Sequence, residues 1–197
     1  MNNFDFVAPF YDRLADLVFG DAIEKSATYF LDEIEEGANV LIVGGGTGKI
    51  LDSLPKCKQV TYLEKSSKMI VRAKRKAPDQ AVKFVEMDFL DFETNEQYDF
   101  VICPFFLDCF DENSLTKVLE RISQSLRTNG GLMVSDFHSK TESTLITLMH
   151  YFFRIFSSLE SKKLKDIHCF ITQSQFQSEK EEFFHQNMIF SRLYRNL

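Results

Sequence analysis

The sequence predicts an α/β protein with a doubly wound, mostly parallel sheet. From residue 39 to residue 136, short apolar runs alternate with amphipathic runs of helical period. This alternation is typical of a parallel sheet with helices on both faces. A glycine-rich loop directly follows the first apolar run. Two strand-like runs close the chain, and we expect them to form an antiparallel hairpin on the same sheet.

Length and charge limit the classes of function. A chain of 197 residues suits one domain with a substantial core, so we assign residues 1–197 to a single domain. The formal net charge of −6 argues against a protein that binds nucleic acid regardless of its sequence. A basic run at 65–76 is the exception, and we interpret it as the solvated face of a helix. We therefore expect no nucleic-acid partner.

The four cysteines form no C-x-x-C pair, which favours reduced, packed thiols in a cytoplasmic protein over disulfides or a metal site. The first residues lack the basic and apolar regions of a signal peptide. The most apolar stretch, 145–156, is too short to span a bilayer and is interrupted by His150 and Arg154. We expect neither a bound metal nor stable membrane insertion.

Two helices are predicted before the first strand. Apolar residues at helical spacing indicate one over 7–19, which ends at Gly20. Asp21 is placed to cap the second helix, which stops before Gly37. We assign residues 1–36 to a helical lid.

The core, residues 38–136, follows the alternating pattern. The predicted strands are 39–43, 59–63, 82–87, 98–103 and 131–136. The predicted helices are 47–54, 66–77 and 112–127, and Asp111 caps the last of them. Asn129-Gly130-Gly131 turn the chain into the fifth strand.

The pattern changes after the fifth strand. A helix over 142–158 is apolar on most of its surface, and a shorter helix follows at about 161–173. We assign residues 140–175 to a helical cap near the substrate. Strands at 176–184 and 188–195, with His185-Gln186-Asn187 between them, form the terminal hairpin of residues 176–197.

The spacing of the glycines can be compared with three ligand-binding motifs. Its glycines stand at 44, 45, 46 and 48, between a strand and a helix. The dinucleotide fingerprint needs glycine where Lys49 stands, and the phosphate-binding P-loop needs Ser or Thr where Ile50 stands. The spacing that remains is G-x-G-x-G, which brings bare backbone close to a polar ligand.

Acidic residues stand where three predicted strands end. In an open parallel sheet, ligands bind at the carboxyl ends of the strands. Glu64 follows the second strand, Asp88 the third and Asp136 the fifth. A carboxylate after the second strand can accept hydrogen bonds from both hydroxyls of a ribose, so we assign this role to Glu64.

Four stretches together resemble the motifs of the class I S-adenosylmethionine (SAM)-dependent methyltransferases. They are Val40–Leu51, Tyr62–Glu64, Met87–Phe89 and Tyr98–Ile102. The resemblance implies that family's Rossmann-like fold and SAM as the cofactor. The segment Tyr11-Asp12-Arg13-Leu14-Ala15 also resembles the first helix of small-molecule members, including the ubiquinone/menaquinone C-methyltransferase group.

The resemblance also implies roles for individual residues. Asp88 would accept from the adenine amino group, with Asp91 as a competitor, and Phe89 would pack on the adenine face. Tyr11 would help to close the site over SAM. The expected cofactor-binding residues are Tyr11, Gly44, Gly45, Gly46, Glu64, Asp88, Phe89, Cys103 and Pro104.

Two positions depart from the family pattern. An acidic residue often stands two positions before the first glycine, but here this residue is Ile42. We expect weaker cofactor binding or a compensating polar group. In Cys103-Pro104-Phe105-Phe106, the proline and the aromatic residue match enzymes that methylate planar amides or bases, but the acceptor side chain at 103 is missing. This argues against DNA adenine or glutamine as the substrate.

A methyl transfer needs a general base only if the attacking atom must lose a proton. The candidates are Asp108, His138 and, more weakly, His150. Each also has a purely structural interpretation. Acceptor contacts are expected from Phe106, Phe137 and Phe152, and the helix at 142–158 is left open as core, lid or homodimer interface.

The predicted function is SAM-dependent methyl transfer to a small, apolar or aromatic acceptor. A non-catalytic SAM-fold protein with a regulatory or scaffold role is the main alternative, because Ile42 and the lack of a clear base weaken the enzyme interpretation. An aminopropyltransferase is disfavoured by the aromatic loop after the fourth strand. A nucleotide-dependent oxidoreductase is disfavoured by Lys49.

Overall fold

The computed structural model describes residues 19–77, 81–138 and 165–197. Three residues with expected roles, Tyr11, His150 and Phe152, lie outside these ranges. The helix predicted at 142–158 also lies outside them, as does nearly all of the one predicted at 7–19.

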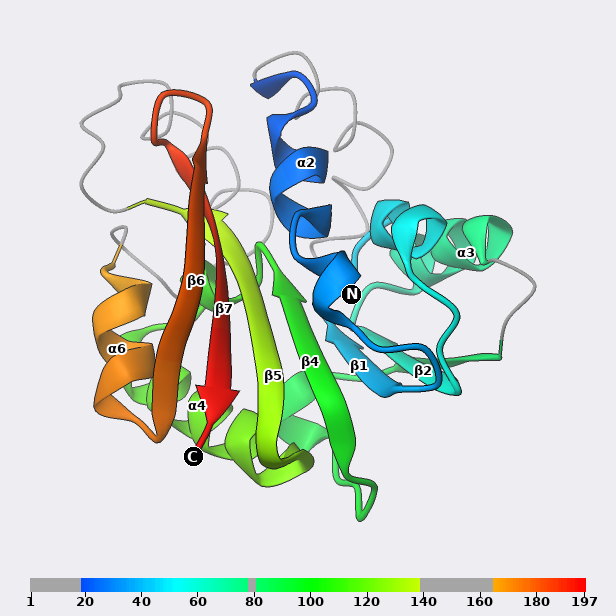
Figure 1. Cartoon of the computed structure of the whole chain (residues 1–197). Coiled ribbons are helices and arrows are strands. Elements are labelled where there is room, and N and C mark those ends of the chain that lie inside the picture. Colours follow the sequence, from blue (N-terminus) through cyan, green and yellow to red (C-terminus); the bar gives the residue numbers. More distant parts are fainter. Residues whose placement is uncertain (1–18, 78–80, 139–164) are drawn as a thin grey trace.

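A seven-stranded sheet forms the centre of the molecule, in the order β3-β2-β1-β4-β5-β7-β6 (Figure 1). The first five strands are parallel, and β7 pairs antiparallel with both β5 and β6. The strands are β1 Asn39–Val43, β2 Gln59–Glu64, β3 Val82–Glu86, β4 Tyr98–Pro104, β5 Leu126–Phe137, β6 Phe176–Phe184 and β7 Ile189–Asn196. The predicted doubly wound sheet with a terminal antiparallel hairpin is confirmed.

The helices lie on both faces of this sheet and are short. They are α2 Ala22–Thr28, η1 Leu31–Glu33, η2 Lys49–Ser53, α3 Ser67–Lys76, η3 Phe89–Asp91, η4 Leu107–Cys109, α4 Glu112–Ser125 and α6 Ile167–Gln173, where η marks a 3-10 helix. Apolar residues of η1, η2 and α3 pack on one face of the sheet, and those of η3, η4, α4 and α6 pack on the other.

The buried strand β1 shows why both faces are covered. Val40 and Ile42 belong to the core cluster on the α3 face, whereas Leu41 and Val43 belong to the cluster on the α4 face. All four side chains are fully buried. Successive residues of a strand point to opposite faces, so an unbroken apolar run fits a strand between two layers of helices.

Several predicted elements differ in detail. The segment after the glycine loop forms a 3-10 helix, Lys49–Ser53, because Pro55 follows closely and stops a longer α-helix. The second predicted helix divides into α2 and η1. Asp21 precedes α2 but makes no capping hydrogen bond, and its carboxylate pairs with Lys25 at 2.6 Å instead.

Strand β5 begins earlier than predicted. Leu126 already pairs with Tyr98, and regular pairing resumes at Gly131 opposite Phe100. The intervening residues bulge out of the ladder, and Asn129 adopts a positive φ of 63° there. The predicted turn is therefore present, but as a bulge within the strand rather than before it.

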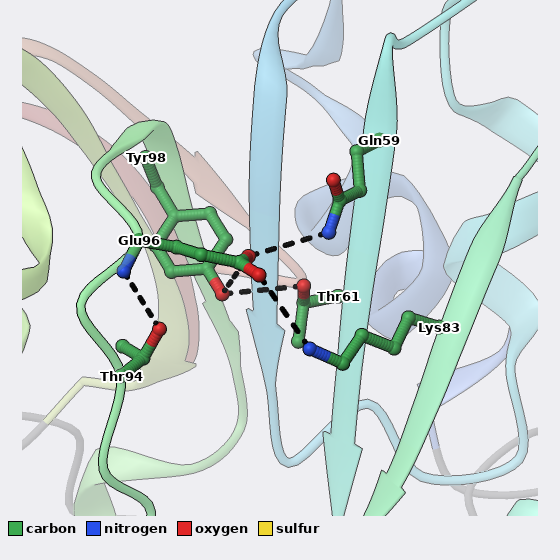
Figure 2. A network of polar contacts seen from close by, with 6 residues as sticks. All are labelled: Gln59, Thr61, Lys83, Thr94, Glu96 and Tyr98. Carbon is green, nitrogen blue, oxygen red and sulfur yellow. Dashed lines mark hydrogen bonds and ion pairs between the residues drawn. The ribbon is translucent and has the colours of Figure 1, made fainter.

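A network of polar side chains joins neighbouring strands toward their amino ends (Figure 2). The Tyr98 hydroxyl lies 3.2 Å from both the Thr61 hydroxyl and the Glu96 carboxylate. Glu96 also binds the Gln59 amide at 3.3 Å and the Lys83 ammonium at 3.5 Å. These contacts join the loop before β4 to β2 and β3. The predicted site residues lie at the other end of the strands, the carboxyl end.

Two further findings concern the described residues alone. No helix among them has the length and apolarity needed to cross a membrane. No group of three or more His, Cys, Asp or Glu side chains in these ranges is arranged to hold a metal ion.

Candidate functional site

The glycine loop joins β1 to η2 at the carboxyl edge of the sheet. Its entry is fixed by the Gly44 amide, which donates to the Leu63 carbonyl of β2 at 2.9 Å. The Gly48 amide donates to the Gly45 carbonyl at 3.3 Å and closes the turn. Gly46 has a φ of 63°, a conformation that other L-residues adopt only with strain. The predicted loop therefore exists as a tight turn built on backbone conformations suited to glycine.

Glu64 lies beneath this loop and points inward. Its Oε2 accepts from the Gly46 amide at 3.0 Å, and its Oε1 accepts from the Ser66 amide at 2.8 Å. The side chain is buried. These two backbone contacts orient the carboxylate toward the loop. The carboxylate expected to bind a ribose thus lies directly against the loop expected to bring bare backbone close to a polar ligand.

Tyr62 is a site residue that sequence reasoning missed. It stands opposite Ile42 in the β1–β2 register and is fully buried. Its hydroxyl donates to the Gly46 carbonyl at 3.0 Å. The sequence held one signal for it, because Tyr62 is two positions before Glu64 and must project from the same face of the strand. Its hydroxyl is thus a polar contact of the loop beside the apolar Ile42.

Asp88 begins the short helix η3. Its Oδ1 accepts from the Leu90 amide at 3.0 Å, and its Oδ2 pairs with the Lys65 ammonium at 2.6 Å. Burial raises the pKa of this carboxyl, but the Lys65 and Leu90 hydrogen bonds outweigh it and hold the pKa below the ordinary value. The structure thus shows Asp88 as an ionised capping residue, and an adenine contact would share its oxygens with these partners. Asp91 is exposed.

Phe89 packs in the core cluster on the α4 face, and only 3% of it is exposed. The Phe106 ring meets it edge to face at 6.0 Å. Phe106 also lies against the glycine loop, since a Cβ added to Gly44 would be 2.5 Å from its ring. The structure therefore brings Phe106, expected on the acceptor side, next to the cofactor loop.

The end of β4 carries the two other expected cofactor contacts. Cys103 is fully buried in the core, and burial raises the pKa of its thiol far above the ordinary range. Its side chain is therefore an uncharged packing group. Pro104 is the last residue of β4 and is half-buried.

Phe137 and His138 follow one another at the end of β5 but have different surroundings. The Phe137 ring lies 5.4 Å from Phe19 and 5.2 Å from Phe105. His138 stacks obliquely on Phe183 of β6 at 5.2 Å, and its backbone amide donates to Met188. The predicted base is thus placed toward the terminal hairpin.

Asp108 of η4 and Asp136 near the end of β5 are neighbours, joined through the Asp108 backbone. Asp136 is fully buried, and its Oδ2 accepts from the Asp108 amide at 3.1 Å. Burial and the nearby Asp108 charge raise the pKa of Asp136 well above its ordinary value. Asp108 also lies beside Cys109, whose thiol is 3.4 Å from its Oδ1. Of the predicted bases in the described part of the chain, Asp108 is the one that lies beside a second carboxyl group, that of the buried Asp136.

The sequence and the fold were compared with those of known proteins. A family model described as a methyltransferase domain matches residues 40–130, which include the glycine loop, Glu64, Asp88 and the end of β4. The central part of the chain is thus similar to a methyltransferase domain. Two solved structures that share the fold contain S-adenosylhomocysteine (SAH), the demethylated product of SAM.

Two curated relatives are malonyl-[acyl-carrier protein] O-methyltransferases. The one from Priestia megaterium is 29% identical over 140 residues, or 66% of this chain and 48% of the relative. The one from Acetivibrio thermocellus is 29% identical over 147 residues, or 73% of this chain and 48% of the relative. The chain thus spans about half the length of the curated relatives that it matches.

Solved structures share the fold at low sequence identity. The N-methyltransferase NodS from Bradyrhizobium japonicum, in complex with SAH, has a TM-score of 0.69 at 16% identity, covering 88% of this chain and 83% of its own. A chain from a complex between a Haloferax volcanii methyltransferase activator and a putative methyltransferase has a TM-score of 0.78 at 13% identity. That match covers 100% of this chain and 98% of the other.

Proposed function

We propose that this protein transfers the methyl group of SAM to an oxygen atom of a small acceptor with an apolar or aromatic body. The observation that carries the proposal is the contact between Glu64 and the Gly46 amide, 3.0 Å apart at the carboxyl edge of the sheet. It unites the acidic group that suits a ribose with the backbone that suits a polar ligand tail.

The described residues fit such a cofactor. Glu64 would accept from the ribose hydroxyls, and the backbone of Gly44, Gly45 and Gly46 would lie along the methionyl part. Asp88 and Phe89 follow the neighbouring strand β3, and we assign them to the adenine side. When bound, SAM supplies a methyl group on a positively charged sulfur, so alignment of the acceptor provides much of the rate enhancement.

The acceptor side is assigned to the ends of β4 and β5. Phe105 and Phe137 form an aromatic wall there, and half-buried rings suit an apolar or aromatic body. Where the attacking oxygen carries a proton, we assign its removal to Asp108, with His138 as the alternative. An acceptor that is already ionised, such as a carboxylate, would need neither.

Oxygen is proposed as the methylated atom for two reasons. The curated relatives are O-methyltransferases. Cys103 also replaces the acceptor side chain that amide- and base-methylating enzymes often carry. The resemblance to the ubiquinone/menaquinone C-methyltransferase group depends on Tyr11, outside the described residues, and it stays a prediction.

Calorimetric titration with SAM and with SAH tests the proposal. We expect saturable binding of both, and a loss of at least about tenfold in affinity for Glu64→Ala, because charged hydrogen bonds to the ribose disappear. Glu96→Ala is the matched control: it removes a carboxylate that also accepts hydrogen bonds, but at the opposite end of the sheet. Binding of neither ligand to the folded wild-type protein would favour the scaffold alternative.

The organisation of the chain is part of the proposal. We propose one domain over residues 1–197, in which residues 1–36 and 140–175 flank the site. The described part of the first segment is consistent with this role, because α2 packs against η2 and the ends of β5 and β7. A homodimer through the apolar segment 142–158 is a secondary proposal, which sedimentation velocity of the full chain would test.

A further inference from the structure

We propose that Tyr62 is a positioning residue for cofactor binding, and that its hydroxyl holds the glycine loop in the shape that receives SAM. The inference rests on the proposed function and adds to it a residue with no expected role in the site. It also accounts for the loss of the acidic residue that the family often has at position 42.

The position of Tyr62 follows from the pairing of two central strands. β1 and β2 are parallel neighbours, and Ile42 is the register partner of Tyr62. Both residues belong to the core cluster on the α3 face and are fully buried. The Tyr62 side chain therefore lies beside that of Ile42 and is long enough to reach the glycine loop, which begins two residues after Ile42.

Two side chains of β2 hold the two sides of Gly46. The Tyr62 hydroxyl donates to the Gly46 carbonyl at 3.0 Å, and Glu64 Oε2 accepts from the Gly46 amide at 3.0 Å. These are the polar groups of the two peptide planes that flank the Gly46 Cα. With both planes held, neither can rotate without breaking a partly buried hydrogen bond.

The aromatic ring supports the same loop from below. A Cβ added to Gly45 would lie 2.3 Å from the Tyr62 ring, so the loop backbone rests directly on it. Among the described residues, a Cβ on Gly46 would meet only the Met69 sulfur, at 3.9 Å. The ring therefore blocks the side of the loop that faces the core, and Gly46 keeps an accessible backbone on its other side.

This arrangement separates two effects of the tyrosine. The ring packs in the core and contributes to folding, whereas the hydroxyl contributes the orientation of the loop. Ligand binding to a loop that must first be ordered is weaker by the cost of ordering it. Removing the hydroxyl alone should therefore lower cofactor affinity while leaving the packed core in place.

Tyr62→Phe and Tyr98→Phe form the test. Tyr98 is also a buried tyrosine of this sheet, and its hydroxyl contacts Thr61 and Glu96 (Figure 2). It is the first residue of β4, whereas the glycine loop follows the carboxyl end of β1. SAH is the probe, and its dissociation constant is measured by calorimetry for the wild type and both variants. The thermal unfolding midpoint of each is measured in parallel.

We expect SAH to bind Tyr62→Phe about five- to tenfold more weakly than it binds wild type, and to bind Tyr98→Phe with wild-type affinity. Both variants should lose thermal stability to a similar extent. Equal SAH affinities in wild type and Tyr62→Phe would overturn the inference and leave the proposed function intact. Absence of SAH binding to wild type would overturn the proposed function itself.

Hydrogen exchange gives a second readout that needs no ligand and no acceptor. The Gly46 amide of the wild type should exchange slowly, because it is hydrogen-bonded to Glu64 in a loop that Tyr62 holds in place. In Tyr62→Phe, the amides of residues 44–48 should exchange faster while those of β1 stay protected. Rapid exchange at Gly46 in the wild-type protein would show that Tyr62 and Glu64 do not hold the loop in place.

Discussion

Phe105 and Phe106 are adjacent in the chain, yet their rings pack in different clusters. The Phe106 ring lies with Phe110 and the glycine loop, and the Phe105 ring lies with Phe137. The backbone makes this possible, because Phe105 has a φ of 52°, in the left-handed region. An aromatic residue rarely adopts this conformation. The strain sits at the carboxyl end of β4, where the proposed cofactor and acceptor sides meet.

The strain at Phe105 predicts an unusual order of stability. Phe105→Ala and Phe105→Gly both remove the ring, but only glycine adopts a positive φ without strain. We expect Phe105→Gly to be about 1 kcal/mol more stable than Phe105→Ala in urea unfolding. The reverse order, which would follow from an ordinary backbone at this position, would contradict the described geometry.

Two glycines of the loop should differ in what they tolerate. A Cβ on Gly45 collides with the buried Tyr62 ring, whereas on Gly46 it meets little but requires a left-handed alanine. We expect Gly45→Ala to lower the free energy of unfolding by about 3 kcal/mol, as overpacking does. Gly46→Ala should lower it by about 1 kcal/mol. Urea unfolding measures both, and equal losses would show that Tyr62 does not lie beneath the loop.

Much of this candidate site could be predicted from the sequence, because an apolar run followed by glycine or an acidic residue marks the end of a buried strand. The apolar run Val40–Val43, the glycines after it and Glu64 fixed both the direction of the sheet and the edge that carries the site. The bounds of β1, β6 and the N-cap Asp111 are as predicted, and here local preference and tertiary packing agree.

What the sequence did not reveal depends on register and on side-chain direction. Tyr62 gained its role from standing opposite Ile42, which is known only once β1 and β2 are paired. The sequence places Phe105 and Phe106 in one aromatic loop. It does not show that their rings separate, because nothing in it signals that Phe105 has a left-handed backbone conformation. The η2 segment was predicted as a longer helix, since the spacing of its apolar residues does not distinguish a 3-10 helix from an α-helix.

The buried carboxyl of Asp136 predicts a pH dependence of stability. Its pKa is raised in the folded protein by burial and by Asp108, so the folded state binds the proton more tightly than the unfolded state. This contribution is fully present below the ordinary value of 3.8 and is lost as pH rises through the raised folded pKa. Asp136→Asn cannot titrate, so its stability relative to wild type should increase with pH over this window in urea unfolding.

Asp111→Asn is the control with the opposite sign. The Ser114 amide hydrogen bond lowers the pKa of the Asp111 carboxyl, so its contribution is present above the ordinary 3.8 and is lost as pH falls through the folded value. The stability difference between wild type and Asp111→Asn should therefore shrink toward acidic pH. Parallel pH profiles for the two variants would contradict the burial of Asp136.

The four thiols should differ in reactivity with iodoacetamide. Cys169 is exposed, whereas Cys57 and Cys103 are buried. Burial raises the pKa of the Cys103 thiol, so it holds little reactive thiolate at neutral pH. Mass spectrometry of the folded protein should show Cys169 modified first and Cys103 only after unfolding. Early modification of Cys103 would place it outside the core.

In the proposed binding mode, SAM lies at the carboxyl edge of the sheet, with its ribose on Glu64 and its methionyl part on the glycine loop. A crystal structure with SAH tests this most directly. We predict that both ribose hydroxyls lie within hydrogen-bond distance of the Glu64 carboxylate and that the ligand contacts the backbone of residues 44–46. SAH bound elsewhere, or bound there with its ribose out of reach of Glu64, would contradict the account.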